Sequence, residues 1–108
     1  MSKQSRDSQG QLWPGIVGKF GTTTGLTVSA TSQQSHAAST GVTLMRVAVA
    51  NNDSHVHFEI GTDPTATSSS PLMPAPCIEY FRVEPGEKIA FLRGAGTNIN
   101  VSITDVIP

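Results

Sequence analysis

The 108-residue sequence is poor in charged side chains. They make up 14% of it, against about 25% in an average soluble domain, and the formal net charge is −1. Between residues 21 and 41 there is no Asp, Glu, Lys or Arg at all. Binding to nucleic acid through its phosphates requires a basic patch, which this sequence lacks. The composition therefore favours uncharged contacts with protein or glycan, and we expect neither nucleic acid nor membrane as a partner.

Cysteine and long apolar runs are also scarce. Cys77 is the only cysteine, which excludes an intrachain disulfide. It opens an apolar run after Pro76 and is interpreted as a small core residue, because a nucleophilic thiol needs a base and a lowered pKa. No apolar run reaches membrane-spanning length, and residues 1–11 lack the apolar region of a signal peptide. The sequence thus predicts neither a membrane helix nor a secretion signal.

Helical periodicity is absent, and short alternating segments take its place. Strands are expected at residues 25–31, 42–50, 55–60, 77–84, 88–93 and 97–106. Turn residues recur about every ten residues, which is typical of a β-sandwich or small barrel. We predict an all-β fold, with a single β-sandwich domain at 21–108 and an N-terminal arm at 1–20. The inward positions of these strands include Phe58, Phe81 and Phe91, so the sequence places these aromatic side chains in the core.

The connections carry their own signals. The cluster at 51–54, Asn-Asn-Asp-Ser, predicts a β-hairpin between the strands at 42–50 and 55–60. Glu84-Pro85-Gly86-Glu87 has the type II turn pattern. Residues 32–41 are predicted to be a loop. A second loop at 61–76 contains four prolines, which exclude a central strand, and Leu72 and Met73 are its expected anchors to the core.

The predicted arm ends in an abrupt apolar patch. Its candidate partner-binding residues are Leu12, Trp13, Pro14, Ile16 and Val17. Glycines interrupt the patch and argue against a helix. A Trp beside a proline in such a segment either caps the domain's own core or anchors into a pocket of a partner. The sequence leaves both interpretations open.

One local motif has the pattern of a metal site. His55, His57 and Glu59 share one face of the strand predicted at 55–60. Cupin-type barrels hold a metal with a similar H-x-H pair, but such a site needs further ligands, and the only other histidine is His36 in a polar loop. We interpret the motif as the solvent or interface face of the strand. We predict no metal and no cofactor, with these three residues as the only candidate ligands.

No catalytic pattern is found. The sequence contains no G-x-S-x-G elbow, no P-loop and no G-x-G-x-x-G motif. The few acidic residues have no spacing that forces two carboxylates together. We therefore predict that the protein is not an enzyme.

Several segments from Val42 to Val106 carry a family resemblance. They are residues 47–50 and 58–67, residues 72–75, and residues 79–91 with 100–104. Together they resemble small structural proteins encoded in the head-gene clusters of tailed bacteriophages. The first forty residues match no such pattern.

The resemblance implies a capsid decoration, or cement, protein with a jelly-roll-like sandwich. Such a protein bridges neighbouring major capsid subunits and stabilises the expanded head. Its implied partners are the major capsid protein and copies of itself, and its implied location is the capsid surface of a virion assembled in the host cytoplasm. Two alternatives remain: another virion component of the tail, head-completion or fibre type, or a carbohydrate-binding or cupin-like metal module.

Overall fold

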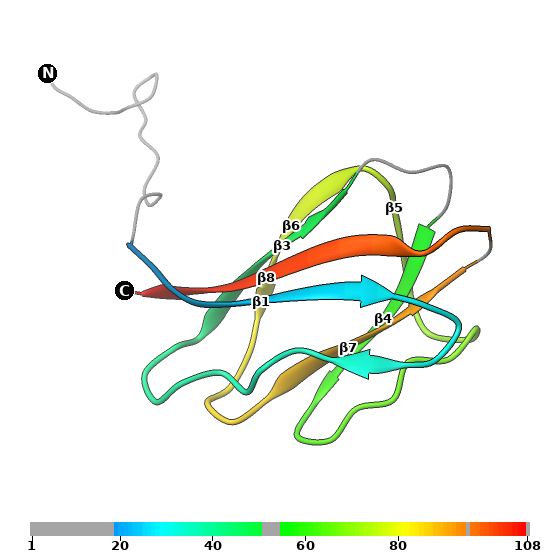
Figure 1. The fold of residues 1–108 in the computed structure, drawn as a ribbon. Coiled ribbons are helices and arrows are strands. Elements are labelled where there is room, and N and C mark those ends of the chain that lie inside the picture. Colours follow the sequence, from blue (N-terminus) through cyan, green and yellow to red (C-terminus); the bar gives the residue numbers. More distant parts are fainter. Residues whose placement is uncertain (1–18, 51–54, 95, 108) are drawn as a thin grey trace, which may run out of the picture.

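The computed structural model describes residues 19–50, 55–94 and 96–107 as two packed β-sheets (Figure 1). Each sheet has four strands, every strand pair is antiparallel, and these residues contain no helix. The predicted all-β sandwich is therefore confirmed.

The first sheet has the strand order β1-β8-β3-β6 and the second has the order β2-β7-β4-β5. In the first sheet the strands are β1 (Lys19–Val28), β8 (Ile99–Ile107), β3 (Leu44–Val49) and β6 (Cys77–Arg82). In the second sheet they are β2 (Gln33–Gln34), β7 (Lys88–Arg93), β4 (His55–Gly61) and β5 (Leu72–Pro74).

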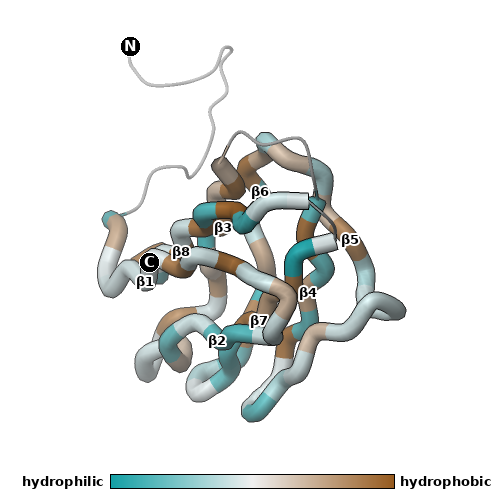
Figure 2. The backbone as a smooth tube through the Cα atoms, turned by 45° about the vertical axis from the view of Figure 1, so that its right-hand side comes forward, coloured by the Kyte–Doolittle hydropathy of each residue, from teal (hydrophilic) through white to brown (hydrophobic). Residues whose placement is uncertain are grey.

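Alternation along the strands fills the space between the sheets. The buried side chains of β3 are Met45, Val47 and Val49, and those of β8 include Ile99, Val101 and Ile103. In Figure 2 the hydropathy colouring accordingly alternates along these two strands. Successive strand residues point to opposite faces, so each of these two strands contributes every second side chain to the core.

The predicted core aromatics come from both sheets. Phe91 on β7 is fully buried. Phe58 on β4 and Phe81 on β6 are half-buried against the core, and their ring centroids lie 4.9 Å apart across the sandwich. This distance is within the range of favourable aromatic pairs. The core placement predicted for these three residues is confirmed.

The predicted hairpin around residues 51–54 is wrong. β3 pairs with β6 and β8, whereas β4 pairs with β5 and β7, so this connection passes from one sheet to the other. The turns between β6 and β7 and between β7 and β8 do the same. A short polar turn specifies a chain reversal, but the next strand then lies either beside the first, about 4.8 Å away, or in the facing sheet, about 10 Å away.

The type II turn at residues 84–87 is confirmed. Gly86 has φ +91°, and the Glu87 amide donates to the Glu84 carbonyl oxygen over 2.9 Å. A positive φ at the third position is what the type II turn requires, and glycine adopts it without steric cost.

The first strand is longer than expected. β1 begins at Lys19, and Phe20 pairs with Val106, so both residues belong to the sheet and not to a preceding arm. Residues 33–34, expected in a loop, form the short strand β2. The threonines at 22–24 carry no apolar alternation, yet threonine favours strands, and an edge strand has a partner on one side only.

The proline-rich segment at 61–76, predicted to be a loop, contains the short strand β5. The prediction that it forms no central strand is confirmed, because β5 is an edge strand. β5 lies at the margin of the second sheet beside β4. Met73 is buried and anchors the segment, as expected, but Leu72 points outward and is 56% exposed. Adjacent strand residues face opposite sides, so both could not anchor to the same core.

Candidate functional site

The outer face of the second sheet is covered by the chain's own loop at 62–71. The side-chain amide of Gln34 on β2 donates to Asp63 Oδ1 over 2.9 Å and to the next carbonyl oxygen over 2.8 Å. Nearer the other end of the loop, Nδ1 of His57 on β4 donates to the Ser70 carbonyl oxygen over 2.8 Å. Ala90 on β7 points to this outer side and is nevertheless fully buried. The loop therefore leaves little of this face for another molecule.

The outer face of the first sheet has no such cover among the described residues. One row of paired residues across the four strands is Gly25, Ser102, Ala48 and Ile78. The next row is Thr23, Thr104, Arg46 and Tyr80. Ile78 is 55% exposed and Tyr80 52%. Large apolar side chains on an open sheet face are typical of a surface that contacts another protein.

The small residues of the first row leave an open groove of about 840 Å³. Its lining includes Gly25, Ala48 and Ser102, with Ile78 on the β6 side. None of the lining residues is charged. We call this hollow the groove, and its shape and chemistry suit an uncharged apolar segment rather than an ion or a charged metabolite.

An aromatic patch lies beside the groove and consists of Phe20, Arg46, Tyr80 and Arg82. The Arg46 guanidinium lies over the Phe20 ring, 5.9 Å from its centroid, and Phe20 is 60% exposed. On the outer face of the first sheet, the outward positions of its four strands carry Arg46 and Arg82 and no acidic side chain. The aromatic patch thus combines apolar surface with positive charge.

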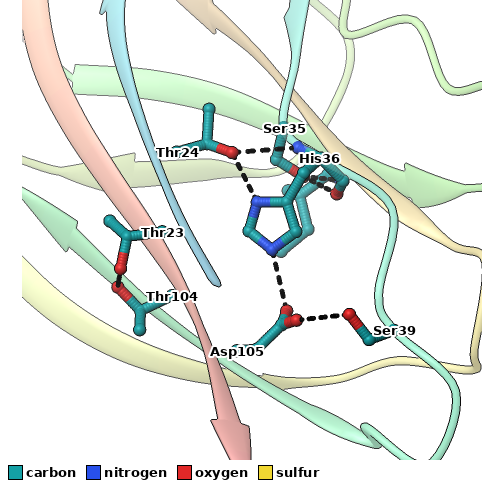
Figure 3. A network of polar contacts seen from close by, with 8 residues as sticks. Thr23, Thr24, Ser35, His36, Ser39, Thr104 and Asp105 are labelled. Atoms are coloured by element: carbon teal, nitrogen blue, oxygen red, sulfur yellow. Dashed lines mark hydrogen bonds and ion pairs between the residues drawn. The ribbon is translucent and has the colours of Figure 1, made fainter. Parts of the chain in front are cut away.

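A buried network of polar side chains lies at the inner side of the same sheet (Figure 3). Asp105 on β8 is 1% exposed, and its Oδ1 lies 2.8 Å from His36 Nε2, while Oδ2 accepts from Ser39 Oγ over 3.2 Å. His36 Nδ1 contacts the hydroxyl of Thr24 on β1, which also accepts from the His36 amide. A buried carboxylate without such partners would be strongly destabilising.

The network contains a hydroxyl, an imidazole and a carboxylate, which are the groups of a hydrolase triad, but its position in the fold indicates a structural role. Thr24 is half-buried on the inner side of β1, and neither it nor His36 or Asp105 lines the groove. The hydrogen bonds instead tie the segment that follows β2 to both β1 and β8. We assign it a structural role.

This network was not predicted from the sequence, although the sequence contains a signal for it. Asp105 continues the inward alternation of Ile99, Val101 and Ile103. A carboxylate at an inward position needs a buried partner. The remaining histidine, His36, was the natural candidate.

The predicted candidate metal ligands lie on the covered face. His55 and His57 are neighbours on β4 with their rings edge to face, centroids 5.1 Å apart, and Glu59 follows on the same side. Within the described ranges no three His, Cys, Asp or Glu side chains are grouped closely enough to hold a metal ion. The contact with the Ser70 carbonyl gives His57 a role in holding the loop.

Cys77 lines the groove and is half-buried against the core. Burial raises the pKa of its thiol, and the negative charge of Glu79 raises this pKa further. A thiol with a raised pKa is a weak nucleophile at neutral pH. This agrees with its interpretation as a small packing residue.

The predicted anchor residues Leu12, Trp13, Pro14, Ile16 and Val17 lie outside the described residues. Among the residues that are described, no helix is suited to crossing a membrane. No protein-family model, curated protein or solved structure matches the chain.

Proposed function

We propose that the protein is a non-enzymatic structural component of a virion, a decoration protein that bridges major capsid subunits and stabilises the expanded head of a tailed bacteriophage. The observation that carries the proposal is the open outer face of the first sheet. Its exposed Phe20, Ile78 and Tyr80 contrast with the second sheet, whose face the chain covers itself.

The strand order supports the finer description of the fold as jelly-roll-like. Each sheet combines early and late strands, in the orders β1-β8-β3-β6 and β2-β7-β4-β5. Eight antiparallel strands in two facing sheets are the layout of a double-sheet jelly roll. The sequence resemblance between Val42 and Val106 points to the same fold.

The aromatic patch suggests the chemistry of the partner surface. Aromatic and arginine side chains are enriched among residues that contribute most to protein interfaces. Because the patch carries Arg46 and Arg82 without an acidic neighbour on the outward face, it fits an apolar surface of the major capsid protein that is rimmed by carboxylates. Many weak contacts of this kind on one shell add up through avidity.

Cosedimentation of the full-length protein with expanded heads tests the proposal. We expect saturable binding at many copies per particle and a higher melting temperature of the decorated heads. Tyr80→Ala should weaken the binding about thirtyfold if Tyr80 is a main anchor. The matched control is Leu72→Ala, because Leu72 is equally exposed but lies on the second sheet, and it should bind as the wild type does.

Absence of cosedimentation would overturn the decoration role. Binding of only a handful of copies per particle would instead favour the tail or head-completion alternative. Equal losses in the Tyr80 and Leu72 variants would show that the open face is not the contact surface.

A further inference from the structure

The groove has the character of a peptide-binding surface. Strand positions that face water are ordinarily polar or charged, as in the alternating strands of antiparallel sheets. Here the floor contains Gly25 and Ala48, Ile78 stands exposed at one side, and the polar residues of the lining carry no charge; they are Thr27, Asn100 and Ser102. An occupant that matches it is apolar, uncharged and narrow enough to lie along a trough in the sheet.

The chain itself contains a segment of that chemistry. Residues 12–17 read Leu-Trp-Pro-Gly-Ile-Val, carry no charge and include the only tryptophan of the protein. They precede β1, which borders the groove, by only a few residues. Tryptophan buries about 150–250 Å² when it enters a pocket, more than most side chains.

The reach of the chain favours a second molecule over the same one as the source of Trp13. Trp13 precedes Lys19 by six residues, which span at most about 22 Å when fully extended. Gly25 lies about 20 Å beyond Lys19 along β1, and Ile78 is three strands further across the sheet, about 14 Å away. The diagonal is about 24 Å, before any residue is used for reversing the chain. The backbone of Trp13 in the same chain therefore falls short of the Ile78 side of the groove even when it is fully extended, whereas a second copy has no such limit.

We propose that the groove of one copy binds residues 12–17 of a second copy, with Trp13 as the anchor. The contact joins two different surfaces, the segment of one molecule and the groove of another, so two copies can exchange segments and close as a dimer, or the contact can continue into larger rings or open chains. The proposal does not depend on the virion role, since it concerns the isolated protein. In this arrangement the second copy occupies the groove, and the aromatic patch remains available to contact the capsid.

The single tryptophan reports directly on this contact. Dilute full-length protein should show the emission of a solvated indole, and the emission should shift to shorter wavelength as concentration and sedimentation coefficient rise together. Ile78→Asp places a charge in the uncharged groove and should weaken the self-association about thirtyfold or more. Leu72→Asp, equally exposed on the second sheet, is the matched control and should leave both readouts unchanged.

A complementation experiment tests whether the contact is made between molecules. Full-length Trp13→Ala keeps the groove but lacks the anchor and the fluorophore, whereas full-length Ile78→Asp keeps Trp13 but lacks a working groove. Neither variant alone should associate. Their mixture should restore the blue-shifted emission and should stop at heterodimers, because each complex uses the one remaining segment and the one remaining groove. Circular dichroism verifies that both variants are folded.

Three outcomes would overturn the proposal. One is wild-type emission and sedimentation that do not change with concentration. Another is blue-shifted emission that persists in Ile78→Asp at all concentrations, which would place Trp13 in the protein's own domain. The third is a mixture of the two variants that behaves as the sum of its parts. None of these bears on cosedimentation with heads, so a failure here is distinguishable from a failure of the decoration role.

Discussion

The two sheets share one core and have the same number of strands, yet their outer faces differ. The second sheet is covered by the loop at 62–71, which is held by Gln34 at one end and His57 at the other. The first sheet leaves Ile78 and Tyr80 exposed around an uncharged groove. In this sandwich the position of the loop at 62–71, rather than any difference in strand pattern, determines which face is available to a partner.

The largest effect on stability should come from the network beneath the open sheet. Asp105→Ala removes a buried carboxylate and leaves His36 and Ser39 without their acceptor. We expect a loss of about 3 kcal/mol in the free energy of unfolding, measured by urea denaturation.

Asp105→Asn is the informative control for this prediction. It retains a side-chain oxygen as acceptor and should lose clearly less stability than the alanine variant. A loss for Asp105→Ala no larger than that of an ordinary surface substitution, within about 0.5 kcal/mol, would show that the network does not hold the segment after β2 to the first sheet.

The covered face gives the second prediction. Gln34→Ala removes the two hydrogen bonds to the loop and a contact from the Lys88 ammonium group. We expect a loss of about 1–2 kcal/mol and faster hydrogen exchange across residues 62–71, since the loop opens locally. The comparable change on the open face is Thr27→Ala, which removes one exposed hydrogen bond to Asn100 and should cost less than about 0.5 kcal/mol. Equal costs would mean that the loop is not a specific cover.

The strand pattern was predictable from the sequence, but strand partners were not. Alternation in residues 44–49 and 99–103 fixed the inward side chains because a buried face requires every second residue to be apolar. The turn at 51–54 could not reveal that β4 joins the other sheet, because turn chemistry is local. Most pairs join distant strands, such as β1 with β8, and are set by the packing of the whole core.

The candidate site was less predictable than the fold. An exposed Ile78 or Tyr80 follows from the outward position in β6, yet the same alternation gives outward residues on both sheets. What separates the two faces is a contact of Gln34 with Asp63, 29 residues away. Such a long-range contact produces no periodic pattern by which it could be recognised in a single sequence.

The third prediction concerns the turn between β6 and β7, which connects the first sheet to the second. Gly86 has φ +91° in the turn between β6 and β7, so Gly86→Ala should cost about 1 kcal/mol even though the added methyl group meets open space. Gly25→Ala is the contrast, because its added methyl group is also unobstructed and its φ lies outside the left-handed region. Thermal unfolding should show a lower melting temperature for the first variant only. Equal shifts would contradict the backbone argument.

The smallest effect is on a reaction rate rather than on stability, and it concerns the thiol of Cys77, which packs against the core from β6 at the edge of the first sheet. Cys77 lines the groove, and its pKa is raised above the ordinary 9.0 by burial and by the charge of Glu79. A raised pKa favours the neutral thiol, so alkylation by iodoacetamide at pH 8 should be slower than for a free thiol and should rise as the pH passes above 9. Glu79→Gln removes the smaller of the two causes and should speed the reaction modestly at pH 8. Fast alkylation at pH 7 would show that the thiol is more exposed and less perturbed than its packing against the core implies.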